Sequence, residues 1–149
     1  MFEAWTEIYS NSKILQTSIL FTHLGGLLIG AGCAVAADRL TLLSAPDDAH
    51  QLNALTGSHR VVIGGLVAMC ISGALMFAAN FDTYVVSRFF WAKMALIVIL
   101  LINGVRLARA EQAAQAAVPG AWGRLRSASI TSLVLWIAVT LFGAILPNV

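Results

Sequence analysis

The chain has 149 residues, of which 59% are hydrophobic and 11% charged, and its net charge is +2. Soluble domains carry roughly 25% charged residues, so a water-soluble domain is excluded. The mean hydropathy of +0.84 and the long uncharged runs indicate one integral membrane domain spanning residues 1–149. The small net charge, without a basic cluster, gives no sign of a nucleic-acid partner.

Four apolar runs predict an all-α integral membrane four-helix bundle, with spans at about 14–37, 57–79, 88–107 and 127–146. Residues 1–13 mix aromatic and acidic side chains at helical spacing, which predicts a short N-terminal interfacial helix. The connector 40–56 holds a helix-start signal, so the second helix is expected to begin before its apolar part. Residues 80–87 predict a short turn and residues 108–126 a polar connector.

Basic residues set the expected orientation. The first and third connectors and their flanks hold six arginines: Arg39, Arg60, Arg106, Arg109, Arg124 and Arg126. The opposite side holds Lys13, Arg88 and the intramembrane Lys93. The positive-inside rule therefore predicts cytoplasmic arginine-bearing connectors and both termini outside, in a bacterial-type inner (plasma) membrane. Cys33 and Cys70 fall in apolar runs and are expected to serve packing rather than a disulfide.

The first span, ILQTSILFTHLGGLLIGAGCAVAA, has no formal charge and one ionisable group, His23. A side chain that ionises at this depth needs a partner, which makes it a candidate functional residue. We expect it either to hydrogen-bond to a neighbouring helix or to bind haem iron or copper. Gly26, Gly30 and Ala34 follow at a spacing of four, so a helix or a flat cofactor has room to approach beside His23.

Lys93 lies about one turn into the third span, within FFWAKMALIVILLING. Its side chain either reaches the outer interface beside Trp91 or points inward as a catalytic proton donor, a ligand or a partner for a carboxylate. Its depth differs from that of His23 by only about 6 Å, which a lysine side chain spans. Asn103, toward the far end of the same helix, is expected to bond across to a neighbouring helix.

His59 begins the apolar part of the second span, beside Arg60. The pair either contacts lipid phosphates at the interface or has a buried role, with His59 as a second metal or haem ligand and Arg60 as a partner for haem propionates. The buried role is favoured by a helical stripe of Leu52, Leu55, His59, Ile63, Leu66, Cys70, Gly73 and Phe77.

Helix geometry separates the two histidines. Folding the first two spans as a hairpin about residue 48 places His23 level with Gly73. The same fold places His59 level with Ala37, so His59 and His23 differ by about 20 Å in depth. Two axial ligands of one iron lie about 4 Å apart. We therefore expect His23 and His59 not to share one haem.

Two stretches, FTHLGGLLIGAGCAVAADRLTL and FFWAKMALIVILL, resemble the CopD/HemJ-like family of small membrane proteins. That family includes haem-binding protoporphyrinogen oxidases and copper-resistance proteins. Its recurring features are a histidine in the first helix followed by small residues, and a lysine within a W/F-x-x-K pattern. The resemblance implies a haem b site with His23 as a ligand and Lys93 beside it.

The leading expectation is a b-type cytochrome in electron transfer or a redox reaction, with a redox partner or a quinone or porphyrin substrate. One alternative is a protoporphyrinogen oxidase-like enzyme. Another is a copper-transport or scaffold protein without haem, which ranks last because Met69, Met76 and Met94 form no Met-x-x-Met cluster. Membrane lipid is an expected partner, and the small-residue strip is compatible with a homodimer.

Overall fold

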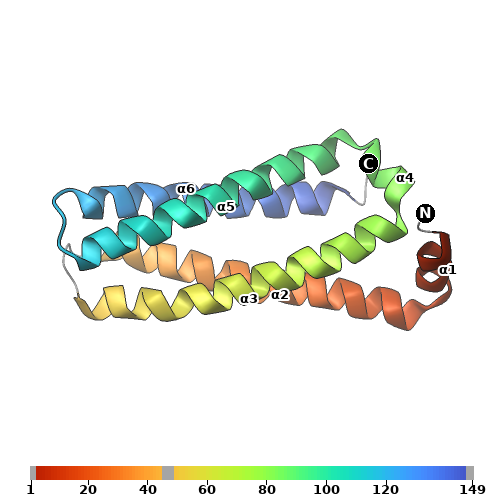
Figure 1. Cartoon of the computed structure of the whole chain (residues 1–149), viewed down its shortest axis with the longest axis horizontal. Coiled ribbons are helices and arrows are strands. Elements are labelled where there is room, and N and C mark those ends of the chain that lie inside the picture. The colour runs from red at the N-terminus through yellow and green to blue at the C-terminus, as the bar shows by residue number, and fades with distance from the viewer. Residues whose placement is uncertain (1–2, 45–48, 147–149) are drawn as a thin grey trace.

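The structure is a computed structural model, and it describes residues 3–44 and 49–146, with side chains described outside residues 49–56. The described residues form helices and no strand (Figure 1). The helices are α1 (Glu3–Asn11), α2 (Lys13–Leu43), α3 (Ala49–Ala79), α4 (Phe81–Val85), α5 (Arg88–Gln115) and α6 (Ala121–Ile145). Four of these, over Lys13–Leu43, Gly57–Ala79, Arg88–Gln115 and Ala121–Ile145, are long and apolar enough to cross a membrane. The predicted all-α membrane four-helix bundle is confirmed.

The bundle consists of two helical hairpins. α2 packs along α3 and α5 packs along α6, and the hairpins join mainly where α2 meets α6. α3 and α5 make few contacts with each other, and Figure 1 shows them on the same side of the bundle. The hairpins therefore close tightly on one side and loosely on the other.

Serine side chains start two of the long helices. Ser12 Oγ accepts a hydrogen bond from the Leu15 N–H at the start of α2, and Ser87 Oγ accepts one from the Phe90 N–H at the start of α5. Each bond satisfies a backbone donor that the first helical turn leaves unpaired. Before α6 the chain turns through Gly120, whose φ of 74° suits glycine.

α1 and α4 lie at the same end of the bundle (Figure 1). The Trp5 indole of α1 donates a hydrogen bond to the Leu75 carbonyl of α3 at 3.0 Å. Phe90 of α5 stacks on Phe77 of α3 with ring centroids 4.9 Å apart, and on Tyr84 of α4 at 5.7 Å. These aromatic contacts join α3 to α5 at this end. The short N-terminal helix is confirmed, and its place at the membrane interface stays a prediction.

The strip of small residues on α2 packs directly on α3. A methyl group on Gly65 would lie 2.6 Å from the Gly30 Cα, and one on Gly26 would lie 2.8 Å from the Gly65 carbonyl oxygen. Side chains cannot occupy such distances, so the two backbones touch as in other small-residue helix pairs. Gly26 and Gly30 therefore serve helix packing, and no flat ring fits between them and α3.

The face of α3 that meets α2 lies mainly outside the stripe that was expected to point inward. Gly65, Met69 and Ser72 are buried there. Of the stripe, Ile63 is 59% exposed and Cys70 is also exposed. Small residues decide the packing face because they allow the closest backbone approach. His59 and Phe77 of the stripe face α5, whereas Gly73 faces His23 of α2. The side chains of Leu52 and Leu55 lie outside the described residues.

Two predicted spans end too early and one begins too late. α2 continues to Leu43, α5 continues to Gln115, and α6 starts at Ala121, so most of the connector predicted at 108–126 is helical. A second buried cluster explains this extension, and its members are Ala110, Ala114, Ala121 and Leu125. Their small side chains let α5 and α6 keep packing past the apolar windows. The turn predicted at 80–87 also contains the short helix α4.

Candidate functional site

His23 is held by a directed chain of hydrogen bonds between α2 and α3. Its Nδ1 lies 3.0 Å from Ser72 Oγ, and the Ser72 hydroxyl lies 2.6 Å from the Ala68 carbonyl. A carbonyl only accepts, so the single Ser72 proton goes to Ala68 and Ser72 Oγ accepts from His23. The Met69 carbonyl also faces the ring and can only accept. His23 is therefore the tautomer with a proton on Nδ1 and a lone pair on Nε2.

The His23 ring packs closely against a glycine of α3. A methyl group on Gly73 of α3 would lie 3.3 Å from His23 Cε1. The contact confirms the predicted register, in which His23 is level with Gly73. His23 itself is half-buried.

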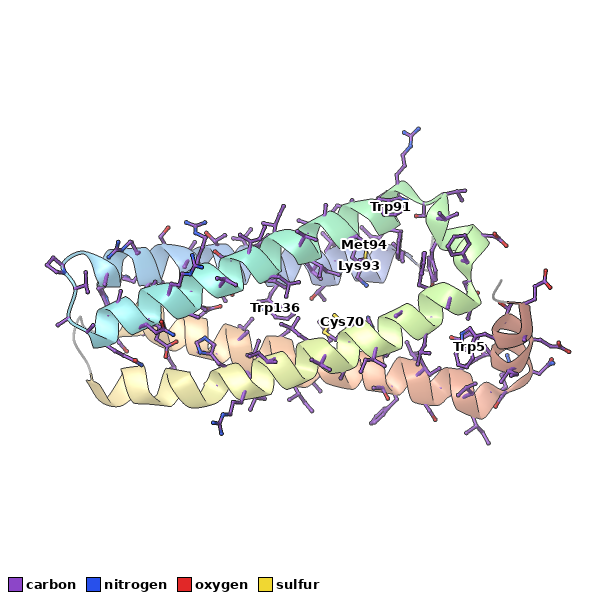
Figure 2. The ribbon with its side chains drawn as sticks, in the orientation of Figure 1. Trp5, Cys70, Trp91, Lys93, Met94 and Trp136 are labelled. Carbon is purple, nitrogen blue, oxygen red and sulfur yellow. The ribbon has the colours of Figure 1, made fainter. Side chains whose placement is uncertain are left out.

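Lys93 points into the bundle from α5, as Figure 2 shows. Its Nζ would lie 3.3 Å from a methyl group on Gly143 of α6, and its charge acts on His23. The lysine is half-buried. The Lys93 side chain thus points inward, and the structure brings Lys93 and His23 together in the same half of the membrane domain, while the role of Lys93 stays a prediction.

His59 lies in the other half. Its Nδ1 is 3.3 Å from the Glu111 Oε2 of α5, and the exposed fractions of the two side chains are 33% and 6%. His59 also faces Asp38 of α2. Asp38 directly follows Ala37, the residue with which His59 was predicted to be level. His59 thus faces inward with neighbours that differ from those of His23, and its role as a ligand stays a prediction. Arg60 is exposed, and among the described residues it is not brought together with His23 or His59.

A cavity of about 460 Å³ lies next to His59, between all four long helices. Its walls are mainly apolar, with Leu66, Leu100 and Trp136 among them. Ile63 and Leu101 also line it, and they are 59% and 46% exposed, so the cavity reaches the surface between α3 and α5. This volume lies within the range of roughly 300–1,000 Å³ typical of small-molecule sites.

Buried polar residues form the inner wall of this cavity. Asp38 is 2% exposed and Thr41 is 1% exposed, both on α2, while Glu111 of α5 is 4% exposed. Ser129 and Ser132 of α6 approach the Asp38 carboxylate. Sequence reasoning missed Asp38 because it stands beside Arg39 and was read as the end of the first helix. The signal that identifies it is its spacing of four after Ala34, on the small-residue face.

Asn103 joins α5 to α6. Its Nδ2 donates to the Ala128 carbonyl at 2.9 Å, and the residue is 3% exposed. The predicted bond to a neighbouring helix is confirmed.

Comparison with family models, with curated proteins and with solved structures found no match.

Proposed function

We propose that the chain is a membrane-embedded protein that binds haem b through His23 and takes part in electron transfer or a redox reaction. The observation that carries the proposal is the chain from His23 to Ser72 to the Ala68 carbonyl, which leaves the Nε2 lone pair for iron. Histidine ligands of metals usually donate their other N–H to a fixed acceptor in this way. The chemistry that haem b supplies is one-electron transfer.

The donor set suits haem better than a bare metal ion. Among the described residues, no group of three or more His, Cys, Asp or Glu side chains could hold an ion. A porphyrin brings four of the iron ligands itself, so one or two protein ligands suffice. His23 supplies one ligand, Ser72 fixes its ring, and the Lys93 ammonium is placed to pair with a carboxylate such as a propionate.

The test is the oxidised and reduced visible spectrum of the purified protein after expression with ample haem. We expect a b-type spectrum in the native chain and in His59→Ala, and its loss in His23→Ala. Ser72→Ala should retain haem more weakly, by about 10- to 100-fold, because the ring loses its orienting partner. Absence of a Soret band in the native chain contradicts the proposal, and so does a spectrum that survives His23→Ala. Copper in place of haem in the metal analysis would favour the copper alternative.

A protoporphyrinogen oxidase-like activity is the second candidate. The inward Lys93 close to His23 favours it, because a porphyrin substrate carries carboxylates that an ammonium can bind. Rescue of a strain that lacks the oxidase, lost in Lys93→Met, would support this activity. Failure of the native chain to rescue excludes it and leaves the cytochrome proposal intact.

A further inference from the structure

The cavity beside His59 contains two polar atoms that the bundle does not satisfy. Asp38 Oδ2 and Ser129 Oγ are buried, and neither atom meets hydrogen-bond geometry with a described residue, although Ser129 and Ser132 lie beside the Asp38 carboxylate. Asp38 is 2% exposed and Ser129 is 0% exposed, and both line the cavity. Leaving a polar group unpaired in an apolar setting costs roughly 1–3 kcal/mol, and more for a charged group. Both atoms can accept a hydrogen bond from a donor inside the cavity.

The charges around the cavity are also incomplete. Its described lining residues include two carboxylates, Asp38 and Glu111, and no lysine or arginine. His59 is the basic side chain among them, and its Nδ1 is paired with Glu111. His59 also faces Asp38, so this one basic side chain serves both carboxylates of the described lining. Buried charges in proteins are almost always paired, so the lining lacks one positive charge.

The size and lining of the cavity indicate what kind of ligand would carry this positive charge. A volume of about 460 Å³ far exceeds that of a metal ion or a water molecule. The walls are mostly aliphatic, and they include Trp136, which is 3% exposed and whose aromatic ring is of a kind that attracts cations. Figure 2 shows Trp136 between the two hairpins. The cavity opens between α3 and α5, two helices that can span the membrane, so a molecule dissolved in the lipid could enter there.

We propose that this cavity binds a primary ammonium on an apolar body, with the N–H groups donating to Asp38 Oδ2 and Ser129 Oγ. The ammonium belongs either to a free lipophilic amine or to the headgroup of an aminophospholipid such as phosphatidylethanolamine. The site is separate from His23 and Lys93, so it does not depend on haem.

The experiment measures binding of 1-adamantylamine, and of the neutral alcohol 1-adamantanol, to the full chain in phosphatidylcholine nanodiscs, with empty nanodiscs subtracted. The native chain should bind the amine about tenfold more tightly than the alcohol, as expected for a charge-assisted hydrogen bond. Asp38→Asn keeps the shape and removes the charge, so it should abolish this preference. The matched control is Asp82→Asn, at an exposed position on α4, which should keep it.

Ser129→Ala provides a second variant in case Asp38→Asn does not fold. It removes one acceptor and keeps the carboxylate, so the amine should bind several-fold more weakly while the alcohol is unaffected. Nanodiscs that contain phosphatidylethanolamine distinguish the sources: competition with the amine identifies the lipid headgroup, and unchanged binding identifies a free amine. Equal binding of amine and alcohol by the native chain overturns the proposal, as does a preference that survives in folded Asp38→Asn.

Discussion

The Asn103 side chain illustrates how a single polar group connects the helices of this bundle. It donates from Nδ2 to the Ala128 carbonyl of α6, while its Oδ1 is buried without a partner in the described structure. The bond gains from the apolar surroundings, and the unpaired oxygen offsets part of that gain. The net contribution of Asn103 to stability should therefore be small but measurable.

We predict that Asn103→Ala lowers the free energy of unfolding by about 0.6–1.7 kcal/mol, the range of hydrogen bonds between helices in membranes. Reversible unfolding in mixed micelles measures the change. Asn80→Ala is the control, because Asn80 is exposed and its side chain donates to the Met76 carbonyl of its own chain segment, one turn away. If both variants lose the same stability, the bond between α5 and α6 is not the cause.

The orientation of a side chain could be predicted where one rule of depth and helical direction was enough. His23, Lys93 and Asn103 are polar side chains far inside apolar runs, and each points inward as that rule requires. Asp38 could not be found in this way, since its burial depends on α6 serines more than 90 positions along the chain. The unpaired atoms of the cavity likewise arise from tertiary packing.

At the scale of the elements, the seam between α2 and α3 is the tightest contact in the bundle. We predict that Gly65→Ala destabilises the protein by about 1–3 kcal/mol, because the added methyl must push two backbones apart. Gly64→Ala is the matched control: its methyl meets nothing within 4 Å. Thermal unfolding of both variants tests the difference, and equal melting temperatures would show that the seam yields without cost.

Helix lengths were underestimated from the sequence for a physical reason. A search for apolar runs finds the part of a helix that lies in hydrocarbon, and it stops where arginines and glutamines begin. α5 and α6 continue beyond that point because one face still packs through Ala110, Ala114 and Leu125. The remaining faces carry the polar residues. A helical period of small residues inside the polar stretch is the signal that marks such an extension.

The short helix α4 carries a phenol whose titration reports on the aromatic end of the bundle. Burial raises the pKa of Tyr84 above its usual value, and the nearby Tyr9 raises it further. A raised pKa means that the folded state favours the neutral phenol. The packing of Tyr84 thus stabilises the fold below about pH 10, and this contribution is lost as the pH rises through the higher folded-state value.

The chain has two tyrosines, so Tyr9→Phe leaves Tyr84 as the single phenol. We predict that its phenolate absorbance in the folded protein appears at higher pH than in the denatured chain. Removing its stacking partner with Phe90→Ala should bring the titration back toward the usual value. A titration that is the same in the folded and denatured protein would show that Tyr84 is not buried in solution.

At the scale of the whole molecule, the sequence determines which residues of consecutive helices lie level with each other better than it determines which helices pack together. The level of His23 with Gly73 follows from loop length and helical rise alone, and the structure confirms it. The loose contact between α3 and α5 does not follow from periodicity, because a helical pattern identifies an apolar face without naming the helix that covers it. The cavity exists because that one pair of helices stays apart.

The orientation of the whole molecule in its membrane remains a prediction from charge. Six arginines lie toward the end of the bundle at which α2 and α5 end and α3 and α6 begin. The positive-inside rule assigns that end to the cytoplasm. Single cysteines in a Cys33→Ala, Cys70→Ala background test the assignment. Asp82→Cys and Val118→Cys place a thiol at exposed positions at opposite ends.

On intact cells, a membrane-impermeant maleimide should label Asp82→Cys at once and Val118→Cys only after the cells are made permeable. Labelling of both variants in permeable cells controls for thiol reactivity. The reverse pattern would place the arginines outside and would also move the opening of the Asp38 cavity to the outer half of the membrane. Because these six arginines lie at one end, replacing them with neutral residues should weaken the bias, and mixed labelling of the Val118→Cys thiol would reveal the loss.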